Sequence, residues 1–138
     1  MSADRKLVID TNLWISRLLI PGRTAAQAVD RGLGWGIPLM SEDTLMELSD
    51  VLSRDKFDRY VSRADRQQFL RLIGGTARVI SVTRKISACR DPKDDKFLDV
   101  ALNGEAQLIL TGDQDLLALH PFHGVEILNP SEFLKLVL

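Results

Sequence analysis

The sequence is poor in several features that would quickly assign a protein to a class. Cys89 is the one cysteine among 138 residues, so an intrachain disulfide is excluded and a reducing compartment is the expected setting. No apolar run approaches the roughly 20 residues that span a bilayer. The N-terminal segment 1–6 leads into a strand without the apolar stretch of a secretory signal. We therefore expect a cytoplasmic protein that does not associate with a membrane.

Excess charge of one sign is also missing. The 18 basic and 19 acidic side chains give a net charge of -1, so the overall charge does not indicate nucleic-acid binding. A net charge near zero is still compatible with nucleic-acid binding through a local basic rim around a metal-centred site. The hydrophobic fraction of 45% and the charged fraction of 27% are ordinary for a soluble globular protein. The length predicts a single domain over residues 1–138.

Short apolar runs alternate with helical patterns along the chain. Runs of this kind, closed by polar turns, are typical of buried parallel strands. The expected strands are 6–10, 37–40, 79–82, 108–111 and 125–128. The expected helices are 12–20, a second from Thr24 to the glycines Gly32, Gly34 and Gly36, 41–53 capped by Ser41, a fourth from Ser62 to Gly74-Gly75, 92–103, 113–119, and a last one capped by Ser131 with Phe133, Leu134 and Val137 on its apolar face. The alternation predicts a mostly parallel sheet of about five strands, covered by helices on both faces.

Four acidic residues stand where strands and helices should meet. Asp10 and Asp113 each close an apolar strand, Asp94 lies in the first turn of a helix, and Glu47 lies within another helix. Ligands of open parallel sheets bind at the carboxyl ends of the strands. Carboxylates gathered there repel one another, and a hard divalent cation relieves the repulsion. The four acids therefore predict a metal-dependent phosphodiesterase.

The helix that begins near Asp91-Pro92 contains competing acids. At about 100° per residue, Asp94 shares an inward arc with Phe97 and Leu98, while Asp95 lies at the edge of that arc. An acid on the buried side of a first turn is costly unless it is capped, paired or metal-bound. The ordinary alternative is that Asp94 has no ligand and only complements the positive end of the helix dipole. Asp95 and Asp99 are predicted to be solvated.

The remaining acids also have ordinary alternatives. Glu47 lies at the flank of its helix and would be solvated if viewed alone, whereas Asp10 and Asp113 could each be only a helix cap. Asp115 competes with Asp113 for the site. Either Thr11 or Thr111 could hold a carboxylate or a metal-bound water by hydrogen bonding.

Taken together, the motifs resemble those of the PIN-domain family, in particular its VapC-like toxin branch. The resemblance is carried by Val8-Ile9-Asp10-Thr11-Asn12, Val51-Leu52-Ser53-Arg54-Asp55-Lys56-Phe57, Arg90-Asp91-Pro92-Lys93-Asp94-Asp95-Lys96-Phe97-Leu98 and Leu110-Thr111-Gly112-Asp113-Gln114-Asp115-Leu116-Leu117, with Glu47 inside a helix. The ordered set and its spacing cover nearly the whole chain.

The resemblance implies a three-layer α/β/α sandwich and a Mg²⁺- or Mn²⁺-dependent ribonuclease. The acids of the family correspond to Asp10, Glu47, Asp94 and Asp113 as catalytic and metal-binding residues. Expected partners are an RNA substrate, a small antitoxin protein and a second copy of the chain in a homodimer. The expected phosphate contacts are Lys93, Lys96, Arg54 and Lys56.

Two other functions are compatible with parts of the pattern. One is a catalytically idle PIN fold used as an interaction module. The other is a receiver-type phosphoacceptor domain, which would need an acid after the third strand, where Val82-Thr83-Arg84-Lys85 stands instead. The sequence does not specify the RNA target, the antitoxin or the number of metal ions.

Overall fold

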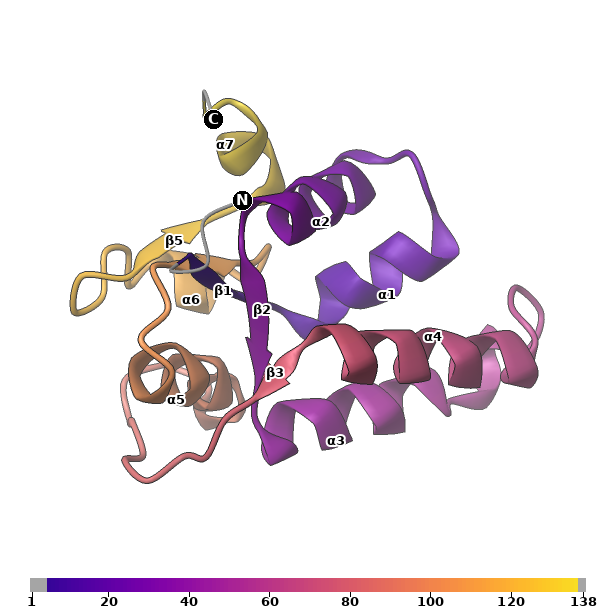
Figure 1. Ribbon diagram of the computed structural model, residues 1–138, viewed down its shortest axis with the longest axis horizontal. Coiled ribbons are helices and arrows are strands. Elements are labelled where there is room, and N and C mark those ends of the chain that lie inside the picture. The colour runs from indigo at the N-terminus through magenta and orange to yellow at the C-terminus, as the bar shows by residue number, and fades with distance from the viewer. Residues whose placement is uncertain (1–4, 137–138) are drawn as a thin grey trace.

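A five-stranded parallel sheet forms the centre of the protein. The computed structural model describes residues 5–136 (Figure 1). The strands are β1 (Lys6–Ile9), β2 (Ile37–Met40), β3 (Arg78–Val79), β4 (Leu108–Leu110) and β5 (Glu126–Leu128). They lie in the order β3-β2-β1-β4-β5, and each pairing between neighbours is parallel. The predicted parallel sheet is confirmed, although β3 is shorter than the expected strand 79–82 and begins one residue earlier.

Helices connect the strands and cover both faces of the sheet. They are α1 (Thr11–Leu19), α2 (Thr24–Trp35), α3 (Glu42–Leu52), the 3-10 turn η1 (Asp55–Phe57), α4 (Arg63–Thr76), the 3-10 turn η2 (Pro92–Asp94), α5 (Asp95–Asn103), α6 (Gln114–Leu117) and α7 (Pro130–Leu134). Helices α3 and α4 lie side by side and project away from the sheet (Figure 1).

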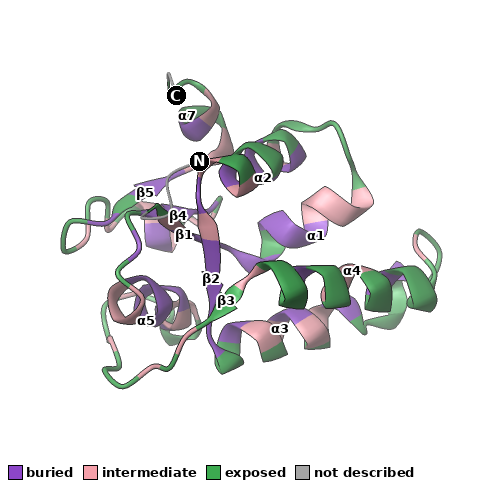
Figure 2. Cartoon of the chain, viewed as in Figure 1, coloured by how far each residue is buried: buried purple, intermediate pink, exposed green. Residues whose placement is uncertain are grey.

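Alternate side chains of each central strand enter two separate hydrophobic cores. In β1, Leu7 and Ile9 pack with residues of α1, α2, α3 and α7, whereas Val8 packs with residues of α5 and α6. This two-residue alternation is the period of an extended strand. Buried positions therefore lie along the sheet and on the inner sides of the helices (Figure 2). The predicted three-layer α/β/α sandwich is confirmed.

Polar caps fix two of the helix starts as predicted. The Ser41 hydroxyl accepts a hydrogen bond from the Thr44 backbone N–H, and the Ser41 N–H donates to the Thr44 hydroxyl in a capping box. The Ser62 hydroxyl accepts from the backbone N–H of Asp65 at the start of α4. These interactions satisfy backbone donors that the helix itself leaves unpaired.

The glycine stops predicted inside α2 and α4 are wrong. Helix α2 continues through Gly32 and Gly34 and ends at Trp35, with Gly36 as its C-cap, so of the three predicted glycines Gly36 is confirmed as the stop. A Cβ added at Gly32 would lie 2.9 Å from Cδ1 of the buried Leu7, so this glycine lets α2 approach β1 closely. Helix α4 likewise continues beyond Gly74-Gly75 to Thr76. A glycine loses roughly 1 kcal/mol of helix preference relative to alanine. Close packing outweighs this loss at Gly32, and continued backbone hydrogen bonding, such as Ala77 N–H to the Ile73 carbonyl, carries α4 past its exposed glycines.

The predicted cap of the last helix is also wrong. Asn129, not Ser131, is the cap residue, and its side chain accepts from the Glu132 backbone N–H while Glu132 accepts from the Asn129 N–H. Pro130 then occupies the first helical position, where a missing N–H costs least. Phe133 and Leu134 lie in the helix as predicted, Phe133 is fully buried, and Val137 lies outside the described residues.

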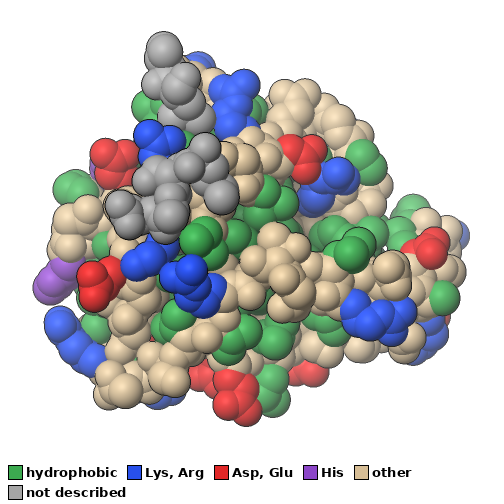
Figure 3. Space-filling view, in the orientation of Figure 1, with side chains coloured by type: hydrophobic (Ala, Val, Ile, Leu, Met, Phe, Trp, Pro, Cys, Tyr) green, Lys and Arg blue, Asp and Glu red, His purple; other side chains and the backbone are tan. Residues whose placement is uncertain are grey.

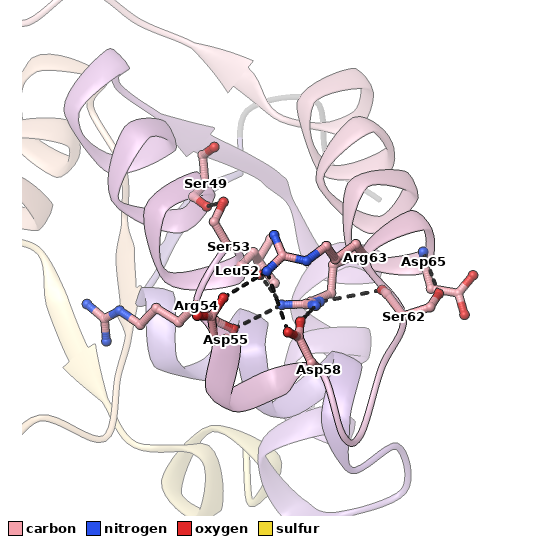
Figure 4. A network of polar contacts seen from close by, with 10 residues as sticks. Ser49, Leu52, Ser53, Arg54, Asp55, Asp58, Ser62, Arg63 and Asp65 are labelled. Atoms are coloured by element: carbon pink, nitrogen blue, oxygen red, sulfur yellow. Dashed lines mark hydrogen bonds and ion pairs between the residues drawn. The ribbon is translucent and has the colours of Figure 1, made fainter.

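A buried arginine joins the far end of α3 to α4. The Arg66 guanidinium donates to the carbonyl oxygens of Leu52 (2.9 Å) and Arg54 (3.1 Å) and forms an ion pair with Asp58. Figure 4 shows how these polar groups converge around the turn between the helices. The hydrogen bond from Arg66 is the main reason that the pKa of Asp58 is lowered. Arg66 therefore satisfies carbonyls that the end of α3 leaves open.

Within residues 5–136, no helix is both long enough and apolar enough to cross a membrane. Acidic and basic side chains are interspersed on the face shown in Figure 3.

Candidate metal centre

The neighbouring strands β1 and β4 bring the first acid of the site into a buried hydrogen-bond network. Asp10 follows β1, is only 5% exposed and caps α1 by accepting from the Asn12 backbone N–H. Its other carboxylate oxygen accepts from the hydroxyl of Thr111 at 2.6 Å. Thr111 follows β4 and is fully buried. The prediction that a threonine holds a site carboxylate is confirmed here.

Three further aspartates form a compact cluster at the same end of the sheet. Asp113 follows β4 and caps α6 by accepting from the Asp115 backbone N–H. Carboxylate oxygens of Asp94, Asp113 and Asp115 all lie within 4.8 Å of one another, and all three residues are half-buried. Asp94 reaches the cluster from η2, on the crossover from β3 to β4. Asp115 was considered as a competitor of Asp113, but the structure brings the two together.

The crowding of these carboxylates changes their titration. Burial, hydrogen bonding to Asp113, and repulsion by Asp113, Asp91 and Asp10 raise the pKa of Asp94 to about 7. The pKa of Asp10 is also raised, chiefly by burial and further by the charges of Asp113 and Glu47, although hydrogen bonds from Thr111 and Asn12 oppose the rise. The ionised cluster is therefore costly without a compensating cation.

Asp95 has a different environment, and the expectation that it and Asp99 are solvated is wrong. Asp95 is 8% exposed and accepts from the backbone N–H groups of Ala88 and Cys89. Burial would raise its pKa, but these hydrogen bonds lower it below the usual value. Asp99 is 5% exposed and accepts from the Ile86 N–H at 2.6 Å. Both acids attach the segment before η2 to α5.

Glu47 lies at the other side of Asp10 and is held between two donors. The Thr11 hydroxyl donates to Glu47 Oε1 at 2.5 Å, and the Lys96 ammonium lies 2.5 Å from Glu47 Oε2. The pair with Lys96 joins α3 to α5. Because Thr11 directly follows Asp10, its hydrogen bond holds Glu47 next to the end of β1; Glu47 is not one of the three clustered aspartates.

Basic side chains border the acids. Arg90 forms an ion pair with Asp115 at 3.1 Å, a contact that was not predicted and that no local sequence pattern indicates. Lys93 is exposed beside Asp94. Arg54 and Lys56 are also exposed, at the far end of α3. An open hollow of about 380 Å³ extends from the pair of Glu47 and Lys96 toward Arg54; its lining residues are Asp43, Met46, Glu47, Asp50, Val51, Arg54 and Lys96.

The donor set fits a hard divalent cation. Mg²⁺ and Mn²⁺ prefer carboxylate oxygens and water, and the cluster offers carboxylates alone. Burial and the neighbouring acids Asp113, Asp91 and Asp10 disfavour the ionised form of Asp94, and a cation bound by these carboxylates would favour it. Asp94, Asp113 and Asp115 are suited to hold such an ion directly, with Asp10 next to them.

Comparison with known proteins assigns the chain to a family. The fold and the acidic site are those of a small α/β protein with a carboxylate centre at the carboxyl edge of a parallel sheet. The family model described as "PIN domain" matches residues 6–115, and the chain therefore belongs to the PIN-domain family. An uncharacterized protein of Methanocaldococcus jannaschii, MJ1680, is 30% identical over 119 residues, which cover 83% of this chain and 74% of that protein.

Solved structures share the fold at low sequence identity. VapBC2 from Rickettsia felis, bound to a DNA fragment from its promoter, matches with a TM-score of 0.61 at 11% identity, covering 90% of this chain and 98% of that chain. VapC20 from Mycobacterium tuberculosis, described as a sarcin–ricin loop cleaving toxin, matches with a TM-score of 0.55 at 16% identity, covering 87% and 98%. The predicted resemblance to VapC-like PIN domains is confirmed at the level of the fold.

Proposed function

We propose that this protein is a divalent-metal-dependent endoribonuclease and the toxin of a toxin–antitoxin pair. The observation that carries the proposal is the convergence of Asp94, Asp113 and Asp115 beside the buried Asp10, at the edge of the sheet where α/β proteins bind ligands. Membership of the PIN-domain family supports nuclease chemistry. The VapBC and VapC structures that share the fold support RNA as the substrate and a small antitoxin as the partner.

The residues of the chain would have distinct tasks in phosphodiester hydrolysis. A bound Mg²⁺ or Mn²⁺ would neutralise the phosphate and acidify a water molecule. Asp94, Asp113 and Asp115 would hold the ion, and the Thr111 hydroxyl would orient Asp10 beside them. Arg54, Lys56, Lys93 and Lys96 are proposed as phosphate contacts; Arg54 and Lys96 line the hollow that extends from Glu47.

The substitution Asp10→Asn tests the proposal. Asparagine is nearly isosteric and is also a good helix cap, so the fold is expected to persist. Loss of the anionic oxygen removes a hard ligand next to the cluster, so cleavage of single-stranded RNA with saturating Mg²⁺ is expected to be abolished. Relief of repulsion is expected to raise the melting temperature in metal-free buffer.

The matched control is Asp30→Asn. Asp30 is an exposed aspartate on α2 that pairs with Arg17 at the surface, so its loss should leave cleavage unchanged. Parental activity in folded Asp10→Asn would contradict the catalytic assignment. Binding of Mn²⁺ measured by calorimetry separates an enzyme from the alternative of an idle PIN-fold module, because the module needs no metal.

A further inference from the structure

The ion pair between Glu47 and Lys96 brings a fixed positive charge to the acidic end of the sheet. The Lys96 side chain is 23% exposed and the Glu47 side chain 28%, so the pair is largely screened from water. The second carboxylate oxygen of Glu47 is engaged by the Thr11 hydroxyl. Both oxygens thus have donors inside the protein, and a metal ion bound to Glu47 would share this carboxylate with the Lys96 ammonium.

Hydrogen bonds link Asp10 to the aspartate cluster and place it next to the residue that contacts the ion pair. Thr111, which donates to Asp10, accepts from the Asp113 backbone N–H, and Thr11, which directly follows Asp10, donates to Glu47. In two-metal sites the ions lie about 3.5–4 Å apart and clamp the attacking and leaving oxygens. The cluster of Asp94, Asp113 and Asp115 would bind the first ion. A second ion held by Asp10 and Glu47 would therefore lie close to the Lys96 ammonium, which is 2.5 Å from Glu47 Oε2.

We propose that Lys96 takes the place of a second metal ion. The protein binds one divalent cation at the aspartate cluster, and the Lys96 ammonium, fixed by Glu47, supplies the second positive charge next to the phosphate. A second divalent ion is disfavoured because it would meet the ammonium at close range and would weaken a partly buried ion pair. This inference rests on the proposed metal-dependent function and specifies which positive charges, one metal ion and one lysine, act at the site.

The experiment counts metal ions on the full chain. Mn²⁺ is titrated by calorimetry, and the bound ions are examined by electron paramagnetic resonance, which distinguishes isolated Mn²⁺ from exchange-coupled pairs. We expect one isolated Mn²⁺ per parent chain. Lys96→Met removes the charge while keeping much of the side-chain volume, and it is expected to bind a second Mn²⁺ that is coupled to the first. The conservative Lys96→Arg variant is expected to retain a single ion.

Lys85→Met provides the matched control. Lys85 also pairs with an acid of α3, Asp43, but this pair is exposed and is not part of the acidic site. The variant loses the same charge and should still bind one isolated ion. Two ions in the parent, or only one ion in folded Lys96→Met, would overturn the assignment of Lys96. A parent that binds no Mn²⁺ would instead overturn the proposed function, and this inference with it.

A second variant keeps the test decisive if Lys96→Met fails to fold. Glu47→Gln retains a polar partner for both Thr11 and Lys96. Because Glu47 is not a ligand of the single ion in this proposal, the variant should bind one Mn²⁺ with an affinity within about tenfold of the parent, the lower range for the loss of an outer partner. Loss of that ion would make Glu47 a direct ligand and would overturn the proposal.

Discussion

Asp94 and Asp95 are neighbours in the chain and have opposite surroundings. Asp94 is crowded by other carboxylates, whereas Asp95 accepts two backbone N–H groups. The sequence argument favoured Asp94 because of an inward arc, but the more buried of the two is Asp95. The prediction that Asp94 shares the buried side of the helix is wrong because Asp94 belongs to the 3-10 turn η2 and α5 begins only at Asp95. The geometry still supports Asp94 as the acid of the site.

Exchange of each carboxylate for an amide separates the proposed catalytic role of Asp94 from the structural role of Asp95. Asp94→Asn is expected to abolish RNA cleavage and to stabilise the metal-free protein by removing a repelled charge. Asp95→Asn is expected to retain most of the activity at saturating Mg²⁺ but to lower the free energy of unfolding by about 1–3 kcal/mol, because the backbone donors lose a charged acceptor. Urea unfolding and cleavage assays on both variants measure this. A dead, stable Asp95→Asn beside an active Asp94→Asn would reverse the assignment.

The raised pKa values predict how the metal-free protein responds to pH. The pKa of Asp94 rises from 3.8 to about 7 on folding, so between these values the folded state binds more protons than the unfolded state. Stability from this group is therefore greatest at low pH and is lost as pH rises through about 7. Asp10 acts in the same direction. The lowered pKa of Asp95 acts in the opposite direction, but only at pH values near or below its usual 3.8.

We therefore expect the urea midpoint in chelator to fall between about pH 5.5 and about pH 8. The decrease should be smaller in Asp94→Asn, which has lost the larger titrating group. Saturating Mg²⁺ should also reduce it, because a bound cation favours the ionised carboxylates. An equal decrease in the parent and in Asp94→Asn would assign the pH dependence to other groups.

At the scale of the element, local chemistry predicted some boundaries and long-range contacts decided the others. Ser41 and Ser62 cap helices as expected because the cap bonds lie within a few residues. Gly32 was misread as a stop because its reason is the close approach of Leu7, which is distant in sequence. The prediction that Asp99 is solvated is wrong because Asp99 accepts a hydrogen bond from the backbone N–H of Ile86. Ile86 lies in a loop, and the helical period of the sequence does not predict where that loop runs.

The α3–α4 hairpin offers a test at the same scale. Arg66 is 3% exposed and donates to the carbonyl oxygens of Leu52, Arg54 and Ser62. Arg63 is exposed and, among the described residues, forms ion pairs with the surface acids Asp55 and Asp58. Arg66→Met is expected to lower the free energy of unfolding by about 2–4 kcal/mol, because buried carbonyls lose their donors. Arg63→Met should cost about 1 kcal/mol or less. Denaturant unfolding measures the free energy of unfolding of both variants. An equal loss in Arg66→Met and Arg63→Met would mean that the buried contacts contribute no more than the surface pairs.

At the scale of the whole molecule, the proposed metal site predicts that a divalent cation stabilises the folded protein. A ligand that binds only the folded state at a hundredfold excess over its Kd stabilises a protein by about 2.7 kcal/mol. We therefore expect Mg²⁺ to raise the melting temperature by several degrees. The same ionic strength supplied as NaCl should have little effect, and Asp94→Asn should lose the response to Mg²⁺. A NaCl effect as large as that of Mg²⁺ would indicate general screening.

The position of β4 in the sheet also affects chains that are still being made. β4 pairs with β1 at one edge and β5 at the other, yet it follows β1 by about a hundred residues in the chain. Until residues 108–113 leave the ribosome, Asp10 lacks its hydrogen bond from Thr111, and Asp94 lacks its neighbour Asp113. The proposed ribonuclease would therefore lack its complete acidic site during most of its own translation, and it would not be expected to cleave the messenger RNA or the ribosome that produce it.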